Sequence, residues 1–193
     1  MKKMPLALST GVLGLSLALS GCADATPPQD DSAPSAQPSA NAADEMFVTM
    51  MIPHHRQAIT MSEVALSKDV IDPRIAALAQ QIKDAQGPEI ETMRGWLDDW
   101  GLEEDAMGGM DHGSSGDGMM SDDDMAALEA ADAETAGLLF LEQMIVHHEG
   151  AVQMAEDVLD AGQDPDVLEL ARRVIDDQAA EIATMRSLID ELS

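Results

Sequence analysis

Two short segments of this sequence place a methionine three residues before a pair of histidines. The residues are Met51, His54 and His55 in the first segment, and Met144, His147 and His148 in the second. Thioether sulfur is a soft, neutral donor that selects Cu(I) among biological metals, and imidazole also binds copper. Zinc would more usually call for cysteine, histidine and carboxylate. The segments therefore predict a copper ion, with Cu(I) favoured and Cu(II) or another soft metal as the alternative.

Further methionines extend both candidate sites. Met61 follows His54 by seven residues and Met154 follows His147 by seven, which places each pair on one side of a helix. Methionine at core spacing is often only a filler of the core, so packing stays the alternative for these single residues. We favour His54 and His147 over their neighbours, because they share a stripe with the methionines. The candidate ligands are Met51, His54, His55, Met61, Met93, Met144, His147, His148, Met154 and Met185.

The stretch 101–121 is rich in glycine, aspartate, serine and methionine and has no apolar periodicity. It is expected to be a loop. A methionine exposed in a polar loop buries nothing, so core filling does not explain this composition, and a loop that captures copper through Met110 and His112 is the better interpretation. The methionines and histidine in and just after this stretch are Met107, Met110, His112, Met119, Met120 and Met125.

An internal repeat organises the chain from residue 44 onward. At an offset of 93 the two histidine segments align, and Phe47 matches Phe140; at an offset of 92, Asp72-Pro73 matches Asp164-Pro165. One hairpin cannot bury its broad apolar face alone, so we expect two repeated helical hairpins in an all-α, antiparallel four-helix bundle. Pro88 is expected to kink or divide its helix. The predicted parts are repeat 1 over 44–100, the linker over 101–121 and repeat 2 over 122–193, with a third helix from about residue 122.

The N-terminal residues predict export. A basic start and an uncharged apolar run precede Leu19-Ser20-Gly21-Cys22, which resembles the lipobox of bacterial lipoproteins. The prediction is a signal peptide over 1–21, lipidation at Cys22 and a flexible tether over 22–43. The lipid would anchor the protein to the outer face of a bacterial cell membrane, or to the periplasmic side of an envelope membrane. An ordinary signal peptide with an incidental cysteine is the alternative.

The charge of the chain excludes some partners. Its 10 basic and 37 acidic residues give a formal net charge of −27. Such an excess argues against nucleic acid and against an anionic lipid surface, so membrane contact is expected through the lipid anchor only. Self-association and a partner for copper transfer both stay open.

The paired M-x-x-H-H-x-x-A-x-x-M segments, each followed by Q-x-x-E-I-x-x-M-R, resemble the DUF305 family of exported bacterial proteins. The resemblance spans about residues 44–192 and implies a ferritin-like four-helix bundle. Some members bind copper, which implies a metal-binding role for the repeated Met and His residues here. Two features depart from a simple duplication: the linker is long, and Gly87-Pro88 stands where the second repeat has Ala179-Ala180.

Two other classes of function were weighed. A di-iron oxidase needs Glu-x-x-His on two helices, and no glutamate lies three residues before any histidine, so we predict that the protein is not an enzyme. The alternative is a non-catalytic surface interaction module, or a pH-responsive helical module, without a physiological metal; paired histidines would give it a transition between about pH 5 and 7. Gln86, Glu89, Gln178 and Glu181 could orient the histidines, but we interpret them as polar residues on helix edges. The leading prediction is copper binding for sequestration or metal resistance.

Overall fold

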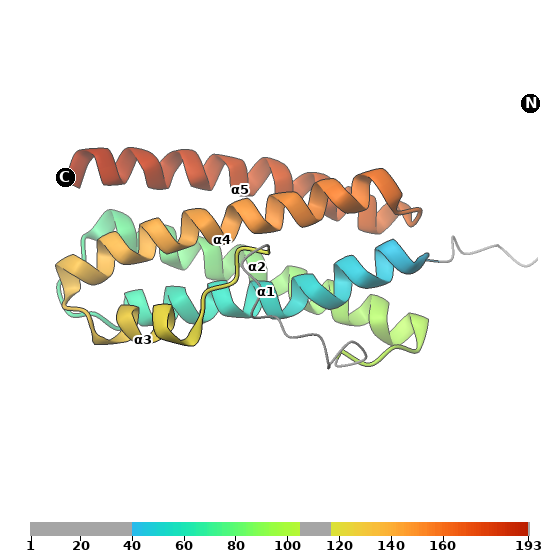
Figure 1. The fold of residues 1–193 in the computed structure, drawn as a ribbon, viewed down its shortest axis with the longest axis horizontal. Coiled ribbons are helices and arrows are strands. Elements are labelled where there is room, and N and C mark those ends of the chain that lie inside the picture. The colour runs from blue at the N-terminus through green and yellow to red at the C-terminus, as the bar shows by residue number, and fades with distance from the viewer. Residues whose placement is uncertain (1–39, 105–116, 193) are drawn as a thin grey trace, which may run out of the picture. The chain divides into compact units, whose positions relative to one another are not determined.

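The computed structural model describes residues 40–104 and 117–192. Within these ranges the chain is helical and contains no strand, which confirms the predicted all-α bundle. The predicted signal peptide, Cys22, Met110 and His112 lie outside the described residues. The helices, shown in Figure 1, are α1 (Ala42–Leu66), α2 (Pro73–Trp100), α3 (Asp122–Ala130), α4 (Ala133–Ala161) and α5 (Pro165–Leu192).

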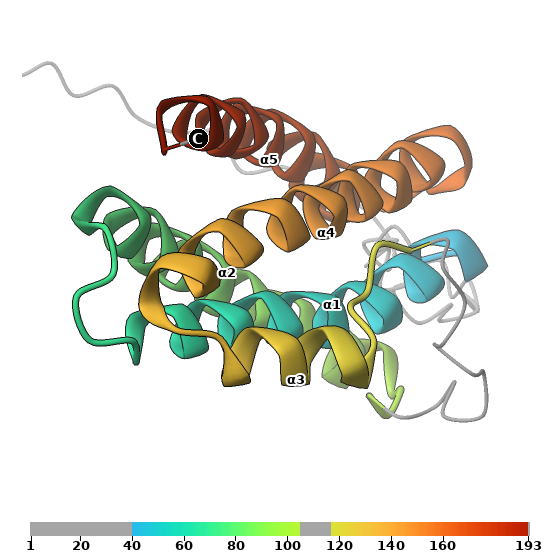
Figure 2. The same ribbon diagram turned by 60° about the vertical axis from the view of Figure 1, so that its left-hand side comes forward.

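The long helices form two hairpins that meet through α1 and α4. The hairpin α1–α2 and the hairpin α4–α5 each pack along their length, and the main contact between the hairpins joins α1 to α4. Figure 2 shows α4 lying between α5 and α1. The two helices that carry the paired histidines therefore face each other. In the described part of the chain, no helix combines the length and the apolar content that a membrane span needs.

Local signals explain where the helices begin and end. Asn41 starts α1 with a capping box, in which its side chain accepts from the backbone N–H of Asp44 while the Asp44 carboxylate accepts from the backbone of Asn41. Asp72 caps α2 ahead of a proline in the first turn. Gly101 ends α2 in the left-handed conformation, with φ of 70°, which glycine adopts without steric cost.

The predicted third helix was wrong as a single element. It is divided into α3 and α4, because Ala131 is extended and Asp132 caps a new helix through the backbone N–H of Thr135. Lys68 donates to the carbonyl oxygens of Glu129 and Ala131 at 2.6 and 2.9 Å. These carbonyl groups at the end of α3 therefore have hydrogen-bond partners although the helix does not continue. The short helix α3 packs against α1 and α4.

Pro88 does not divide its helix. The helix α2 is continuous from Pro73 to Trp100. Pro88 removes only the hydrogen bond to the carbonyl of Asp84, and both residues are exposed, so water can satisfy that carbonyl. Pro53 lies inside α1 in the same way, one residue before the first histidine pair.

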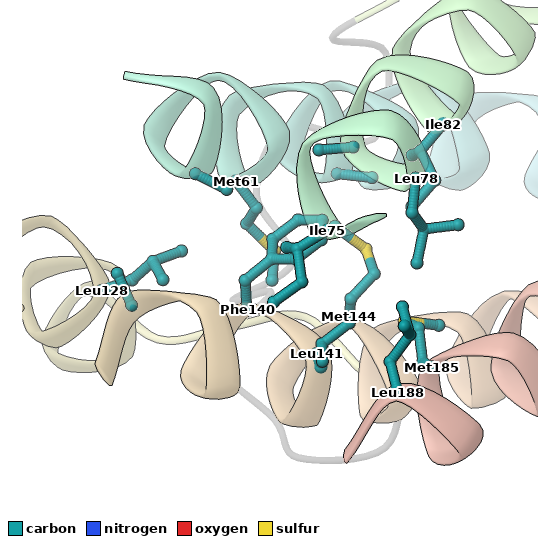
Figure 3. Close-up of a cluster of buried hydrophobic side chains, with 14 of the residues drawn as sticks. Met61, Ile75, Leu78, Ile82, Leu128, Phe140, Leu141, Met144, Met185 and Leu188 are labelled. Atoms are coloured by element: carbon teal, nitrogen blue, oxygen red, sulfur yellow. The ribbon is translucent and has the colours of Figure 1, made fainter. Parts of the chain in front are cut away.

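The core consists of two apolar clusters, one toward each end of the bundle. The first apolar cluster, shown in Figure 3, includes Met61, Ile75, Leu78, Ile82, Leu128, Phe140, Leu141, Met144, Met185 and Leu188. The second apolar cluster includes Phe47, Val48, Met51, Ile52, Ile90, Met93, Leu97, Val158, Val167, Leu170 and Val174. Along every long helix a polar stretch separates the residues of one cluster from those of the other, and all four stretches contain buried side chains. We name the polar layer after these residues: His54, His55, Gln86, Glu89, His147, His148, Gln178 and Glu181.

The buried carboxylate of Asp44 joins the start of α1 to the turn between α4 and α5. It accepts from the backbone N–H groups of Gln163 and Asp164 at 3.0 and 3.2 Å. Asp44→Ala would leave these donors unpaired, so we expect a loss of about 2 kcal/mol in the free energy of unfolding by urea. Asp166→Ala removes the same charge from an exposed position in the first turn of α5 and is the control. Equal losses in the two variants would contradict the role assigned to Asp44.

Candidate metal centre

One histidine from each hairpin meets its counterpart at the interface between the hairpins. The rings of His54 on α1 and His147 on α4 have their centroids 3.7 Å apart, with an interplanar angle of 37°. Both side chains are buried, at 1% and 0% relative exposure. The broad apolar stripes predicted this interior position, and the crossing of α1 and α4 places the two rings in contact.

The second histidine of each pair contacts a glutamate within its own hairpin. His55 Nε2 lies 2.8 Å from Glu89 Oε2, and His148 Nε2 lies 2.7 Å from Glu181 Oε2. The interpretation of Glu89 and Glu181 as helix-edge residues was therefore wrong. Since a carboxylate can only accept, Nε2 of each histidine donates this bond, and in the tautomer that would bind a metal Nδ1 offers the lone pair. A carboxylate in this position fixes the orientation of an imidazole and makes it a stronger ligand.

Several polar atoms of the layer have no hydrogen-bond partner among the residues that the structure describes. Burying such an atom unpaired costs free energy unless another group satisfies it. Gln86 and Gln178 are each 3% exposed, so their amides also belong to the interior and not to a helix edge. The unpaired atoms of the layer are the Nδ1 atoms of His54, His55, His147 and His148, Nε2 of His147, and Oε1 of Gln86 and Gln178. Imidazole nitrogen and amide oxygen both coordinate metal ions, so these atoms fit a metal site.

Burial keeps the central histidines neutral. It lowers the pKa of His54 from 6.5 to about 3; the nearby His55 acts in the same direction, and the bond to the Asp117 carbonyl opposes the shift. Burial also lowers the pKa of His147 well below 6.5, with repulsion from His54 as the next cause. A metal ion binds imidazole only in its unprotonated form. Both side chains are therefore in the binding-competent state at neutral pH.

The residues just before α3 lie over the histidine pair. His54 Nε2 donates to the carbonyl oxygen of Asp117 at 2.9 Å, and the Gln57 side chain pairs with both backbone groups of Met120 at 2.7 and 2.8 Å. The sequence pattern predicted this segment to be part of a loop that captures copper, and it did not predict the contact with His54. The sequence contained one sign of this contact, the glycines Gly118 and Gly150. In the structure, a Cβ at either position would collide with the backbone of the opposing segment.

Gly150→Ala tests this contact. A Cβ at position 150 would lie 1.9 Å from the carbonyl oxygen of Asp117, which is too close, so the segment 117–120 would have to move. We expect the loss of the His54–Asp117 bond and faster amide exchange at Met120, measured by hydrogen exchange. Gly95→Ala is the control, because a Cβ there meets nothing within 4 Å. The assignment would fail if exchange at Met120 were the same in both variants.

The thioethers lie on both sides of the polar layer and do not form one group. Met61, Met144 and Met185 belong to the first apolar cluster (Figure 3). Met51 and Met93 belong to the second, with Met154 packed against it and partly exposed. Each cluster thus receives methionines from both repeats. In the described ranges, no three His, Cys, Asp or Glu side chains come together as a metal cluster.

Two methionines near the linker have a different role from the predicted one. Met120 and Met125 are partly buried and pack against the first apolar cluster. For these two residues the explanation as filler of the core holds, since α3 folds back over α1 and α4.

A comparison with known protein families identifies the chain. The model for the "Domain of unknown function (DUF305)" matches residues 44–189. The chain belongs to the DUF305 family. The resemblance noted from the repeated Met-His segments is therefore confirmed.

Solved structures of DUF305 proteins are similar to this chain. One from Streptomyces coelicolor is 31% identical with a TM-score of 0.71, covering 78% of this chain and 92% of its own. One from Deinococcus radiodurans is 30% identical with a TM-score of 0.71, covering 80% and 99%. CopM in its Cu(II)-bound form is 34% identical with a TM-score of 0.67, covering 78% and 97%. No curated protein sequence matches.

Proposed function

We propose that this DUF305 protein binds copper, with Cu(I) favoured, at the polar layer and the thioethers beside it. The observation that carries the proposal is the buried contact between His54 and His147, whose ring centroids are 3.7 Å apart. Three of their four ring nitrogens have no partner in the described part of the chain. A bundle selected only for stability would gain from apolar side chains at these positions. An interior metal ion would compensate for the unpaired nitrogens.

The donor set supports a soft ion. Neutral imidazoles lie between two groups of thioethers, and the described residues offer no competing cluster of hard ligands. CopM has been solved in Cu(I)-bound, Cu(II)-bound and silver-bound forms. The ligands we propose are His54, His55, His147 and His148, with Met51, Met61, Met93, Met144, Met154 and Met185 as the thioether set and Met110 and His112 as linker ligands.

The proposed setting is outside the cytoplasm. The Streptomyces coelicolor relative is described as a candidate secreted protein, and the N-terminal sequence supports export with lipidation at Cys22. A protein anchored there would sequester copper and limit its toxicity without catalysing a reaction. The large negative charge would raise the local concentration of cations.

Competitive titration with Cu(I) tests the proposal. The metal-free chain from residue 22 is titrated anaerobically against a chromophoric Cu(I) chelator, beside a variant in which all four paired histidines are alanine. We expect the unchanged protein to remove copper from the chelator and the variant to bind at least about 100-fold more weakly, which is the scale of loss when even supporting groups of a metal site are removed.

Two double variants refine the assignment of ligands. His54→Asn with His147→Asn removes the contacting pair, and His55→Asn with His148→Asn removes the pair that contacts glutamates. The first is expected to lose more affinity. Equal affinity in the unchanged protein and the four-alanine variant would refute copper binding at the polar layer.

A further inference from the structure

A surface pocket near one end of the bundle lies outside the polar layer. It has a volume of about 360 Å³, and every residue that lines it belongs to α1 or α4. Three of the lining residues are methionines, and one is an aspartate. The residues are Ala43, Met46, Phe47, Met50, Met154, Asp157, Val158 and Ala161.

Core filling does not account for Met46 and Met50, while Met154 also packs against the second apolar cluster. Met46 is 47% exposed, and Met50 and Met154 are partly exposed. An exposed thioether gains little from the hydrophobic effect, since its apolar surface stays in water. Their shared feature is that all three reach one pocket from two different helices.

The repeat supplies an internal comparison for this pocket. At the offset of 93, Met46 corresponds to Leu139, Met50 to Gln143 and Asp157 to Val64, while Met154 corresponds to Met61. The equivalent groove is covered by α3: Leu139 and Val64 pack against the first apolar cluster beside Leu128 of α3.

The helix α3 also makes a hydrogen bond with Gln143, the residue of that groove that corresponds to Met50. The Gln143 side chain donates to the carbonyl oxygen of Asp124 on α3 at 3.1 Å. One copy of the groove thus holds residues that dock a helix. The copy near Ala43 holds soft donors and a carboxylate at the same places.

The two helices that form the pocket are held together at its rim. Asn41 Nδ2 donates to the carbonyl oxygen of Ala161 at 2.8 Å, and Asp44 accepts from Gln163 and Asp164 in the next turn. The backbones that carry Met46 and Met154 are therefore fixed relative to each other. Methionine side chains have three rotatable bonds and can close around an ion from this frame.

The position of the pocket relates it to the histidines. Met50 precedes His54 by four residues and Met46 precedes Met50 by four, so the three lie on one side of α1 over about two turns. Met154 follows His147 by seven residues on α4. A row of soft donors thus runs from the exposed pocket toward the buried pair.

We propose that Met46, Met50 and Met154 form a second, solvent-accessible site for a monovalent soft cation, Cu(I) or Ag(I), with Asp157 supplying negative charge beside it. Three neutral thioethers suit a soft ion of single charge. The pocket and its lining residues support the site by themselves. Copper would enter here on its way to the polar layer, and this role rests on the proposed function of that layer.

Silver titration with labelled methionines tests the outer site. The chain from residue 22 carries ¹³C-methyl methionine, and silver nitrate is added while methyl NMR spectra and the number of bound ions are recorded. We expect the methyl signals of Met46, Met50 and Met154 to shift together. Changing Met46 and Met50 to leucine, which leaves Met154 available to the inner site, should lower the bound silver by about one equivalent. Met125→Leu, on α3, is the matched control and should leave the count unchanged; circular dichroism checks the fold of each variant.

The variant with His54→Asn and His147→Asn separates the two sites. It is expected to keep the three methyl shifts while it loses the inner equivalent. Retention of the full silver count by the variant with Met46→Leu and Met50→Leu, or unshifted methyl signals at Met46 and Met50 in the presence of bound silver, would overturn the outer site and leave the inner one standing. The outer site would also be overturned if the histidine variant lost bound silver and the leucine variant did not.

Discussion

His147→Leu is expected to make the metal-free protein more stable while removing most of its affinity for copper. Both ring nitrogens of His147 are buried and have no hydrogen-bond partner within residues 40–104 and 117–192. An unsatisfied buried polar group costs about 1–3 kcal/mol, and an apolar side chain of similar volume avoids that cost. The same change deletes a ligand from the contact with His54. Stability and binding should therefore move in opposite directions.

Urea unfolding of the metal-free protein and competitive Cu(I) titration measure the two effects. His148→Leu is the matched control, because it is the adjacent residue on α4 and is equally buried. That change leaves Oε2 of the Glu181 carboxylate, 2.7 Å from His148, without its partner, while Gln81 still donates to Oε1 at 3.3 Å. Since Glu181 is only 7% exposed, the change should destabilise the protein. If His147→Leu destabilised the fold as much as His148→Leu does, His147 would be a structural residue and not a site held for a metal.

Acidification of the metal-free protein is expected to unfold it through His54 and His147. The unfolded chain protonates histidine near pH 6.5, whereas burial lowers the pKa of His54 in the fold to about 3 and that of His147 well below 6.5. Between these values the unfolded state binds protons that the folded state does not. Stability is therefore complete above pH 6.5 and falls as the pH drops toward 3. At about 1.4 kcal/mol per pKa unit, the shift of His54 alone corresponds to a loss of several kcal/mol.

Urea unfolding at a series of pH values measures this loss, with the double variant His54→Leu and His147→Leu as control. The control keeps every carboxylate, so the general effect of acid on this acidic protein is common to both. We expect the unchanged protein to lose stability more steeply below pH 6.5. Parallel curves would contradict the burial of neutral histidines.

The same curves address the alternative function. Paired histidines in a pH-responsive module predict a metal-free transition between about pH 5 and 7. Because burial lowers the pKa of both central histidines, the folded protein is expected to protonate them at a more acidic pH than this window. A cooperative transition between pH 5 and 7 would instead favour the pH-responsive module.

The sequence by itself determined the helices, most of their ends and the buried positions of the histidines. Asn41, Asp72 and Gly101 carry local capping information, since a cap depends on the conformation of only a few neighbouring residues. Helical periodicity is equally local, so the stripe through Met51 and His54 indicated the buried face before any partner was known. The family followed from the same repeated segments.

Only the tertiary structure decided which atoms meet. The 3.7 Å contact of His54 with His147 depends on how α1 crosses α4, and the glutamate partners depend on the register of each hairpin. The division of the methionines between two clusters follows from the antiparallel directions of α1 and α4. The cover over one groove depends on α3 folding back, while its equivalent holds an open pocket lined by Met46, Met50 and Met154. Such contacts join residues far apart in the chain, so local spacing alone could not specify them.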